Sequence, residues 1–177
     1  MTILNDASLR GKAKALAKEH GLSAQEIMQR YFFEHLLMRL ERTQYREHFV
    51  IKGGLLLSSM MGVAQRTTMD LDATIRALTV SEETVAAAMR DICSINLGDG
   101  IDFAFERVEP IRKDDDYGGL RAHLTATFGR MRTPLKVDVT TGDIITPREI
   151  EYQFPTLFGE GPIHLISYPL ETCIAEK

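Results

Sequence analysis

Long apolar runs and cysteines are scarce in this chain of 177 residues. No apolar run approaches the ~18 residues that a membrane-spanning helix needs, so no membrane span is expected. The first residues lack the apolar core of a signal peptide, which makes the cytoplasm the expected location. The two cysteines, Cys93 and Cys173, lack metal-type spacing. This favours buried thiols in a reducing compartment over a disulfide framework.

Neither sign of charge dominates the sequence. Lys and Arg total 21 against 25 Asp and Glu, for a formal net charge of −4. This excludes a uniformly basic nucleic-acid-binding surface but leaves room for a local basic groove. A composition that is 44% hydrophobic and 26% charged is typical of a folded soluble protein and excludes disorder. Repeats and Pro/Gly/Ser linkers are also missing, so we expect one domain over residues 1–177.

Hydrophobic periodicity divides this domain into three parts. Residues 1–46 are predicted to be helical, and residues 47–168 to form a mixed sheet with helices. Residues 169–177 are predicted to start a last helix. Gly21 is expected to end the first helix, and Ser23 to cap the second.

Alternation predicts the strands of the central part. Three of them, 101–108, 120–128 and 135–140, form an antiparallel meander. Short helices are expected up to Gly62 and over 82–96. The order predicts an α+β fold with two leading helices. The expected strands are 49–51, 69–75, 101–108, 120–128 and 135–140, with weaker candidates at 150–154 and 163–167.

Three carboxylates form the most informative pattern. Asp70 and Asp72 occupy alternate positions of one strand, which places both on one face about 6.5–7 Å apart. Asp138 lies on a later strand with the same alternation. Hard oxygen ligands at this spacing suit Mg²⁺ or Mn²⁺. The alternative is that the acids simply face water on a half-exposed sheet.

A second pattern precedes these acids. Lys52-Gly53-Gly54 follows a strand and begins a helix, where glycines permit close backbone approach and the helix N-terminus favours phosphate. Arg66 and Thr68 lie between this turn and the acidic strand. A tight turn and an ordinary surface arginine are the alternatives. Together with the acids, this arrangement favours in-line nucleotidyl or phosphoryl transfer.

Four blocks of the sequence resemble a known family. They are FVIKGGLLLSSMMG, RTTMDLD, LKVDV and YPLETCIAEK. The order of Gly-Gly turn, acidic pair and third acid is similar to the nucleotidyltransferase superfamily of the DNA polymerase β type. The blocks together more closely resemble the AbiEii/AbiGii abortive-infection toxins of type IV toxin–antitoxin systems. That resemblance implies a polymerase β-like nucleotidyltransferase lobe.

The resemblance also implies roles for individual residues. Asp70, Asp72 and Asp138 would hold the metal, with Asp138 also able to position or deprotonate the attacking hydroxyl. The residues expected to bind the nucleoside triphosphate are Lys52, Gly53, Gly54, Arg66, Thr68 and Lys136, with Lys177 of the AEK block near its phosphates. Lys136 is also expected to be the counter-charge of Asp138. The implied acceptor is an RNA, such as a tRNA 3′ end, or a protein, and the implied partner is a cognate antitoxin.

The sequence leaves two alternatives to nucleotidyl transfer. The family usually continues past the AEK block, whereas this sequence stops at Lys177. An inactive or shortened module that binds nucleotide or an antitoxin without turnover is therefore the main alternative, and a metal-dependent phosphohydrolase is a weaker one. Arg130, Arg132 and Lys136 are expected to form either a basic groove for RNA or ordinary surface charge. The cations of the first helix are likewise expected either to contact nucleic acid or to form an ordinary solvated face.

Overall fold

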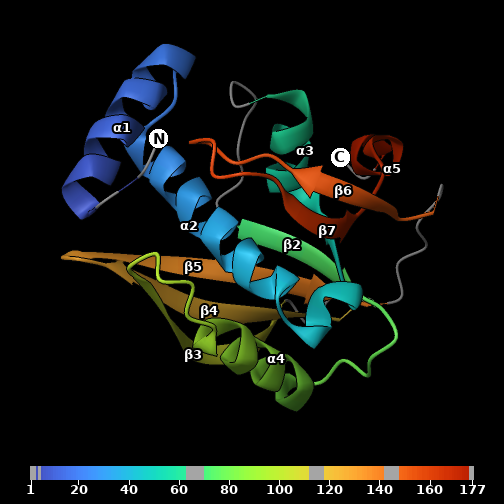
Figure 1. Ribbon diagram of the computed structural model, residues 1–177. Helices are drawn as coiled ribbons and strands as arrows, with labels where there is room; N and C mark the ends of the chain where they lie inside the picture. Colours follow the sequence, from blue (N-terminus) through green and yellow to red (C-terminus); the bar gives the residue numbers. More distant parts are fainter. Residues whose placement is uncertain (1–2, 4, 63–69, 112–117, 142–147, 176–177) are drawn as a thin grey trace.

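The computed structural model describes residues 3, 5–62, 70–111, 118–141 and 148–175. Two helices lead into a sheet, as predicted (Figure 1). They are α1 (Asp6–His20) and α2 (Ala24–Glu41). Gly21 ends α1 in the left-handed conformation, and Ser23 caps α2 through a reciprocal capping box with Glu26. The local chain chemistry therefore sets both helix boundaries.

A seven-stranded mixed sheet forms the centre of the molecule. Its strand order is β3-β4-β5-β2-β1-β7-β6. Strands β3, β4 and β5 pair antiparallel as the predicted meander, and β2 runs parallel to β5. The strands are β1 (Phe49–Lys52), β2 (Asp70–Ile75), β3 (Ile101–Ile111), β4 (Gly119–Phe128), β5 (Met131–Thr140), β6 (Ile150–Phe154) and β7 (Ile163–Ser167). The α+β fold with a mixed sheet is confirmed, with β3 and β5 longer than predicted.

Three shorter helices and a 3-10 turn complete the fold. These are α3 (Gly53–Met61), α4 (Glu82–Ser94), α5 (Leu170–Ala175) and η1 (Gln44–Glu47). Helices α2 and α4 cover one face of the sheet, where a small apolar space is lined by α2, α4 and strands β1, β2 and β5. Leu71 and Val137 contribute to that lining. Because side chains alternate along a strand, their neighbours Asp70, Asp72 and Asp138 point from the opposite face. No helix in the described part of the chain is long and apolar enough to cross a membrane.

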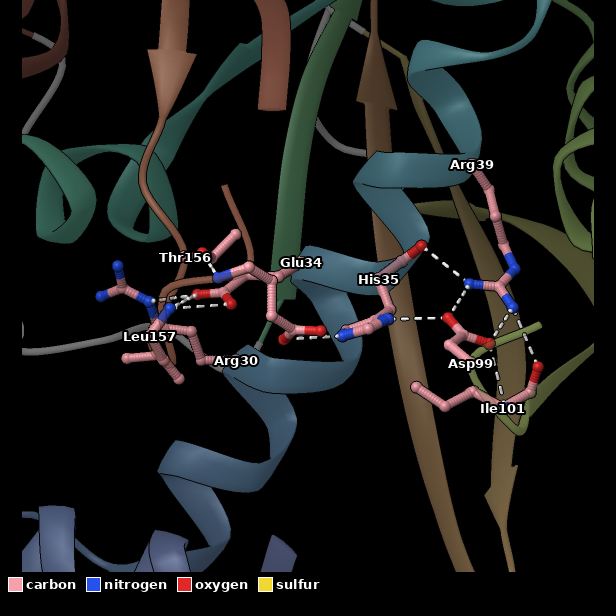
Figure 2. Close-up of polar contacts among 9 residues, drawn as sticks. Arg30, Glu34, His35, Arg39, Asp99, Ile101, Thr156 and Leu157 are labelled. Atoms are coloured by element: carbon pink, nitrogen blue, oxygen red, sulfur yellow. Dashed lines mark hydrogen bonds and ion pairs between the residues drawn. The ribbon is translucent and has the colours of Figure 1, made fainter. Parts of the chain in front are cut away.

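Helix α2 differs from a simple amphipathic helix because it is buried nearly all round. Most of its apolar side chains are buried, but so are four charged or titratable side chains, Arg30, Glu34, His35 and Arg39 (Figure 2). The Glu34 carboxylate accepts from Nε of Arg30 at 3.3 Å and from the backbone N–H of Leu157 at 3.0 Å. Burial raises the pKa of Glu34 to about 7 despite these contacts. Polar side chains thus attach the segment before β7 to the helix.

The other half of this polar cluster holds the segment before β3. Both ring nitrogens of His35 are paired, Nδ1 with Asp99 at 2.7 Å and Nε2 with Glu160 at 3.1 Å. Burial lowers the pKa of His35, but these two hydrogen bonds outweigh it and raise the pKa to about 9. Arg39 donates to both oxygens of Asp99 and to the carbonyl of Ile101. We interpret the cluster as a structural support, because each group has a partner within the fold.

Candidate active site

The strand register aligns four charged side chains across the second face of the sheet. Lys52 of β1 lies opposite Asp72 of β2, Asp72 opposite Asp138 of β5, and Asp138 opposite Arg121 of β4. Paired residues of neighbouring strands project from the same face. We call Lys52, Asp72, Asp138 and Arg121 the charged row. Three of its members were predicted as site residues, and Arg121 was not.

Asp70 extends the charged row by one step along β2. It lies two residues before Asp72 and therefore on the same face. Its Oδ2 is 3.7 Å from Nη2 of Arg121. Asp70 lies opposite Lys136 of β5, which in turn lies opposite His123 of β4. The structure therefore brings the three predicted carboxylates to neighbouring positions of two strands.

Arg121 is the counter-charge of Asp138. Its Nε donates to Oδ1 at 2.7 Å and its Nη2 to Oδ2 at 2.9 Å, a bidentate pair. The prediction that Lys136 neutralises Asp138 is wrong, because Lys136 is exposed and forms no ion pair with any described residue. The strand register explains which cation reaches Asp138. Arg121 lies directly opposite Asp138 on the antiparallel partner strand, whereas Lys136 lies opposite His123 and Asp70.

Asp72 lies at the most constrained point of the charged row. Burial raises its pKa, the charge of Asp138 raises it further, and the result is about 6 even though Lys52 opposes the shift. Gly53 lies against this carboxylate with φ at +80°. A Cβ at position 53 would be only 2.4 Å from Oδ2 of Asp72. The glycine was expected to permit a close approach, and the structure shows that the approaching group is the Asp72 side chain.

Thr140 and Tyr168 hold Lys52 at the end of the charged row, and neither was predicted as a site residue. Its ammonium donates to Oγ1 of Thr140 at 2.7 Å and lies 5.7 Å from the centre of the Tyr168 ring. The hydroxyl of Tyr168 is 2.6 Å from Oγ1 of Thr74. Tyr168 could have been predicted as a site residue from its position in the sequence block YPLETCIAEK. These contacts fix the Lys52 ammonium where its charge opposes the rise in the pKa of Asp72.

Comparison with known proteins identifies the family. A family model described as "Nucleotidyl transferase AbiEii toxin, Type IV TA system" matches residues 35–177. The chain belongs to this AbiEii family. A search of curated proteins gave no match. The match places most of the chain within the nucleotidyltransferase domain that defines this family.

Solved structures support the same fold for the AbiEii chain. One is a Helicobacter pylori protein assigned as a nucleotidyltransferase, with 18% identity and a TM-score of 0.53. The match covers 88% of this chain and 58% of that one. The other is JHP933 from H. pylori, with 20% identity and a TM-score of 0.51, covering 88% of this chain and 56% of that one. The chain thus spans less than two thirds of the structures that it matches.

The carboxylates of the AbiEii domain fit a hard divalent cation by the type of their ligand atoms. Asp70, Asp72 and Asp138 supply oxygen ligands of the kind that Mg²⁺ and Mn²⁺ prefer. In their present conformations, no three acidic, histidine or cysteine side chains among the described residues converge as a bound ion requires. Arg121 donates to both oxygens of Asp138 and would compete with an ion for them.

Several predicted nucleotide-binding residues fall outside the region that the structure describes. Arg66, Thr68 and Lys177 are among them. Gly54 is the second residue of α3, directly after Gly53. The sequence block from Lys52 to Gly54 thus forms a strand–turn–helix junction beside Asp72.

Proposed function

We propose that the protein transfers a nucleotide from a nucleoside triphosphate to an RNA or protein acceptor, with Mg²⁺ or Mn²⁺. In this proposal it acts as the toxin of a toxin–antitoxin or abortive-infection system and is opposed by a cognate antitoxin. The observation that carries the proposal is the juxtaposition of Asp70, Asp72 and Asp138 beside the junction at Gly53. Membership of the AbiEii family supports the reaction class.

Each part of the site has a role in this proposal. Asp70 and Asp72 hold the metal with Asp138, which also positions the attacking hydroxyl. Lys52 neutralises phosphate charge, and the N–H groups at Gly53 and Gly54 face the phosphates at the start of α3. Lys136 adds a cation beside Asp70. Arg66, Thr68 and Lys177 contribute further triphosphate contacts.

The reaction is an in-line displacement at the α-phosphorus. An acceptor hydroxyl loses its proton and forms the new P–O bond, while the bond to the β-phosphate breaks and pyrophosphate leaves. A divalent ion, when bound, stabilises the charge on the attacking and leaving oxygens. In this proposal Asp138 accepts the hydroxyl proton and gives up hydrogen bonds from Arg121 when it does. Lys52, fixed by Thr140, remains a stationary positive charge beside the reacting phosphates.

A label-transfer assay tests the proposal. The protein is incubated with Mg²⁺ or Mn²⁺, each α-labelled triphosphate in turn, and either total cellular RNA or protein. We expect one triphosphate to label one acceptor class, and Asp70→Ala to abolish the labelling. Asp102→Ala, which removes an exposed acid of β3, is the matched control and should label normally. Absence of labelling under every condition would contradict the proposal.

A binding module without turnover is the second candidate function. The observation that favours it is the bidentate pair between Arg121 and Asp138, which keeps one carboxylate engaged. Calorimetry with Mg²⁺ and each triphosphate separates the two candidates when it is compared with the labelling assay. Binding without labelling indicates the module, whereas binding with labelling indicates the enzyme. Absence of triphosphate binding would contradict both candidate functions.

A further inference from the structure

A line of hydroxyl groups leads from the interior of the protein to Lys52. The Lys52 ammonium donates to Oγ1 of Thr140 at 2.7 Å. Thr140 of β5 lies opposite Thr74 of β2, and their Oγ1 atoms are 3.5 Å apart. Oγ1 of Thr74 is in turn 2.6 Å from the hydroxyl of Tyr168. We call Thr140, Thr74 and Tyr168 the hydroxyl chain.

The hydroxyl chain lies beside the charged row. Thr74 follows Asp72 by two residues on β2, and Thr140 follows Asp138 by two residues on β5. Both threonines therefore project from the same face of the sheet as the carboxylates. Since β2 and β5 are parallel, the threonine pair occupies the next position along the two strands that carry the candidate metal ligands.

Burial fixes the far end of the hydroxyl chain. Tyr168 is 0% exposed and Thr74 is 3% exposed. A buried hydroxyl that loses its hydrogen-bond partner destabilises the fold, so these two side chains keep one another in place. Tyr168 also donates its backbone N–H to the carbonyl of Ile51 at 2.9 Å. This bond attaches the segment after β7 to the residue directly before Lys52.

The Lys52 charge needs such support to stay at one point. A lysine ammonium is a point charge on a flexible four-carbon stem, and much rotamer freedom is lost when it is fixed. Thr140 accepts one of its N–H groups, and the ring of Tyr168 lies 5.7 Å from Nζ, within the ~6 Å of a cation–π contact. Both contacts come from the hydroxyl chain, so a shift of the chain would release the ammonium.

From this geometry we propose that the hydroxyl chain positions the Lys52 ammonium as a fixed phosphate-binding cation. Thr74 and Tyr168 are positioning residues, because they act through Thr140 and Lys52 and do not touch the phosphates. The inference rests on the proposed nucleotidyl transfer, in which Lys52 binds the triphosphate. It adds that triphosphate affinity depends on hydrogen bonds between residues that the substrate does not contact.

The physical reason for this dependence is pre-organisation. A side chain that is already ordered binds its ligand without a further loss of conformational freedom, whereas a mobile side chain must be ordered during binding. An intact hydroxyl chain should therefore favour triphosphate binding, although the number of contacts to the phosphates stays the same.

A double-mutant cycle between Tyr168 and Lys52 tests the inference. Tyr168→Phe removes one oxygen and keeps the ring, and Lys52→Met removes the charge and keeps a long side chain. Calorimetry with Mg²⁺ and each triphosphate compares the wild type, the two single variants and the double variant. Tyr152→Phe is the matched control, because its hydroxyl pairs with Oγ of Ser59 at 3.0 Å, outside the hydroxyl chain.

Tyr168→Phe should weaken triphosphate binding about threefold to tenfold, the change that one net hydrogen bond gives. Where Lys52 is already methionine, the same substitution should change the affinity less than about twofold, because the two residues act as a unit. Tyr152→Phe should bind like wild type. Equal weakening by Tyr168→Phe in both backgrounds would overturn the inference, since a general structural loss does not depend on the Lys52 charge. Unchanged affinity in Tyr168→Phe would overturn it as well.

Thr74→Val provides a second route to the same result. It keeps the shape of the side chain and removes the hydroxyl in the middle of the chain, so it should show the same dependence on Lys52. Urea unfolding establishes that each variant is folded at the temperature of the binding experiment. The cycle thus does not depend on the folding of Tyr168→Phe alone.

A measurement without triphosphate separates this inference from the proposed function. NMR of isotope-labelled lysine side chains follows the exchange of ammonium protons with water, which is slow where a hydrogen bond fixes the ammonium. The Lys52 signal should be resolved in wild type and in Tyr152→Phe, and lost through faster exchange in Tyr168→Phe. This pattern in a protein that binds no triphosphate would contradict only the proposed function. Triphosphate binding with the same Lys52 signal in all three proteins would contradict only the inference.

Discussion

Asp72 is the residue on which the candidate site depends most. Neighbouring carboxylates and burial make its ionised form unfavourable, and this raises its pKa to about 6. Residues that are electrostatically unfavourable in the free fold are frequent at functional sites. A purely structural acid would have no reason to occupy this position beside Asp138. A neutral side chain should therefore improve the fold and remove the function.

Asp72→Asn should stabilise the metal-free protein at pH 8. The native pKa of about 6 exceeds the unfolded value of 3.8, so ionisation of Asp72 lowers stability as pH rises through this window. The loss is about 3 kcal/mol at the usual 1.36 kcal/mol per pKa unit. Urea unfolding with chelator should show the variant more stable than wild type at pH 8 and nearly equal at pH 4. Asp102→Asn should change neither value, and a less stable variant at pH 8 would contradict the account.

Arg121→Ala tests whether Asp138 is a metal ligand. Arg121 competes with an ion for the oxygens of Asp138, and charge-assisted hydrogen bonds contribute about 1.5–3 kcal/mol. Removal of the guanidinium should therefore raise Mg²⁺ affinity about tenfold or more, measured by calorimetry, while it lowers metal-free stability. Arg107→Ala removes an exposed arginine of the neighbouring strand β3 and serves as the control. Unchanged Mg²⁺ affinity would show that Asp138 is not a ligand.

At the scale of elements, alternation and capping predicted most of the fold. Strands such as 120–128 alternate clearly, and Ser23 and Gly21 mark helix ends by their own chemistry. Helix α2 shows the limit of this reasoning. Periodicity predicted the helix but not that Arg30, Glu34, His35 and Arg39 would be buried. Such burial depends on tertiary partners such as Asp99, which sequence periodicity does not reveal.

The junction between β1 and α3 requires glycine at position 53. Alanine there would adopt a left-handed conformation that costs about 1–2 kcal/mol, and its Cβ would clash with Asp72 for about 1–3 kcal/mol more. Gly98→Ala is the control, because Gly98 has φ at +69° and nothing near its Cβ direction. Urea unfolding should show Gly53→Ala to be clearly the less stable variant. Equal losses would mean that Asp72 does not constrain position 53.

The polar cluster on α2 should contribute to stability rather than to activity. Arg39→Ala leaves Asp99 without its bidentate partner and should cost about 3–5 kcal/mol in urea unfolding, as expected for a broken buried ion pair. Arg42→Ala removes an exposed arginine one residue past the end of α2 and should change stability by less than about 0.5 kcal/mol. A loss of triphosphate binding by folded Arg39→Ala would contradict the structural interpretation.

For the whole molecule, the sequence identified the acids but not their arrangement. Asp70, Asp72, Asp138 and Lys52 follow from alternation and motif order. Arg121 could not be found, because its pairing with Asp138 depends on the register between β4 and β5. A cavity lined by α1 and β5 likewise joins segments that lie more than a hundred residues apart. The single domain over residues 1–177 stays a prediction, as do the antitoxin partner and the cytoplasmic location.

A Mn²⁺ titration followed by amide NMR tests the central claim most directly, because the paramagnetic ion broadens the signals of the residues nearest to it. The account predicts that the amides of Gly53, Asp72 and Asp138 broaden first, and that Asp72→Asn abolishes this selective broadening. Signals beside Asp99 and Glu160, two acids that pair with the buried His35, should persist. Broadening that begins at Asp99 and Glu160, or that is unchanged in Asp72→Asn, would contradict the assignment of the charged row as the metal and nucleotide site.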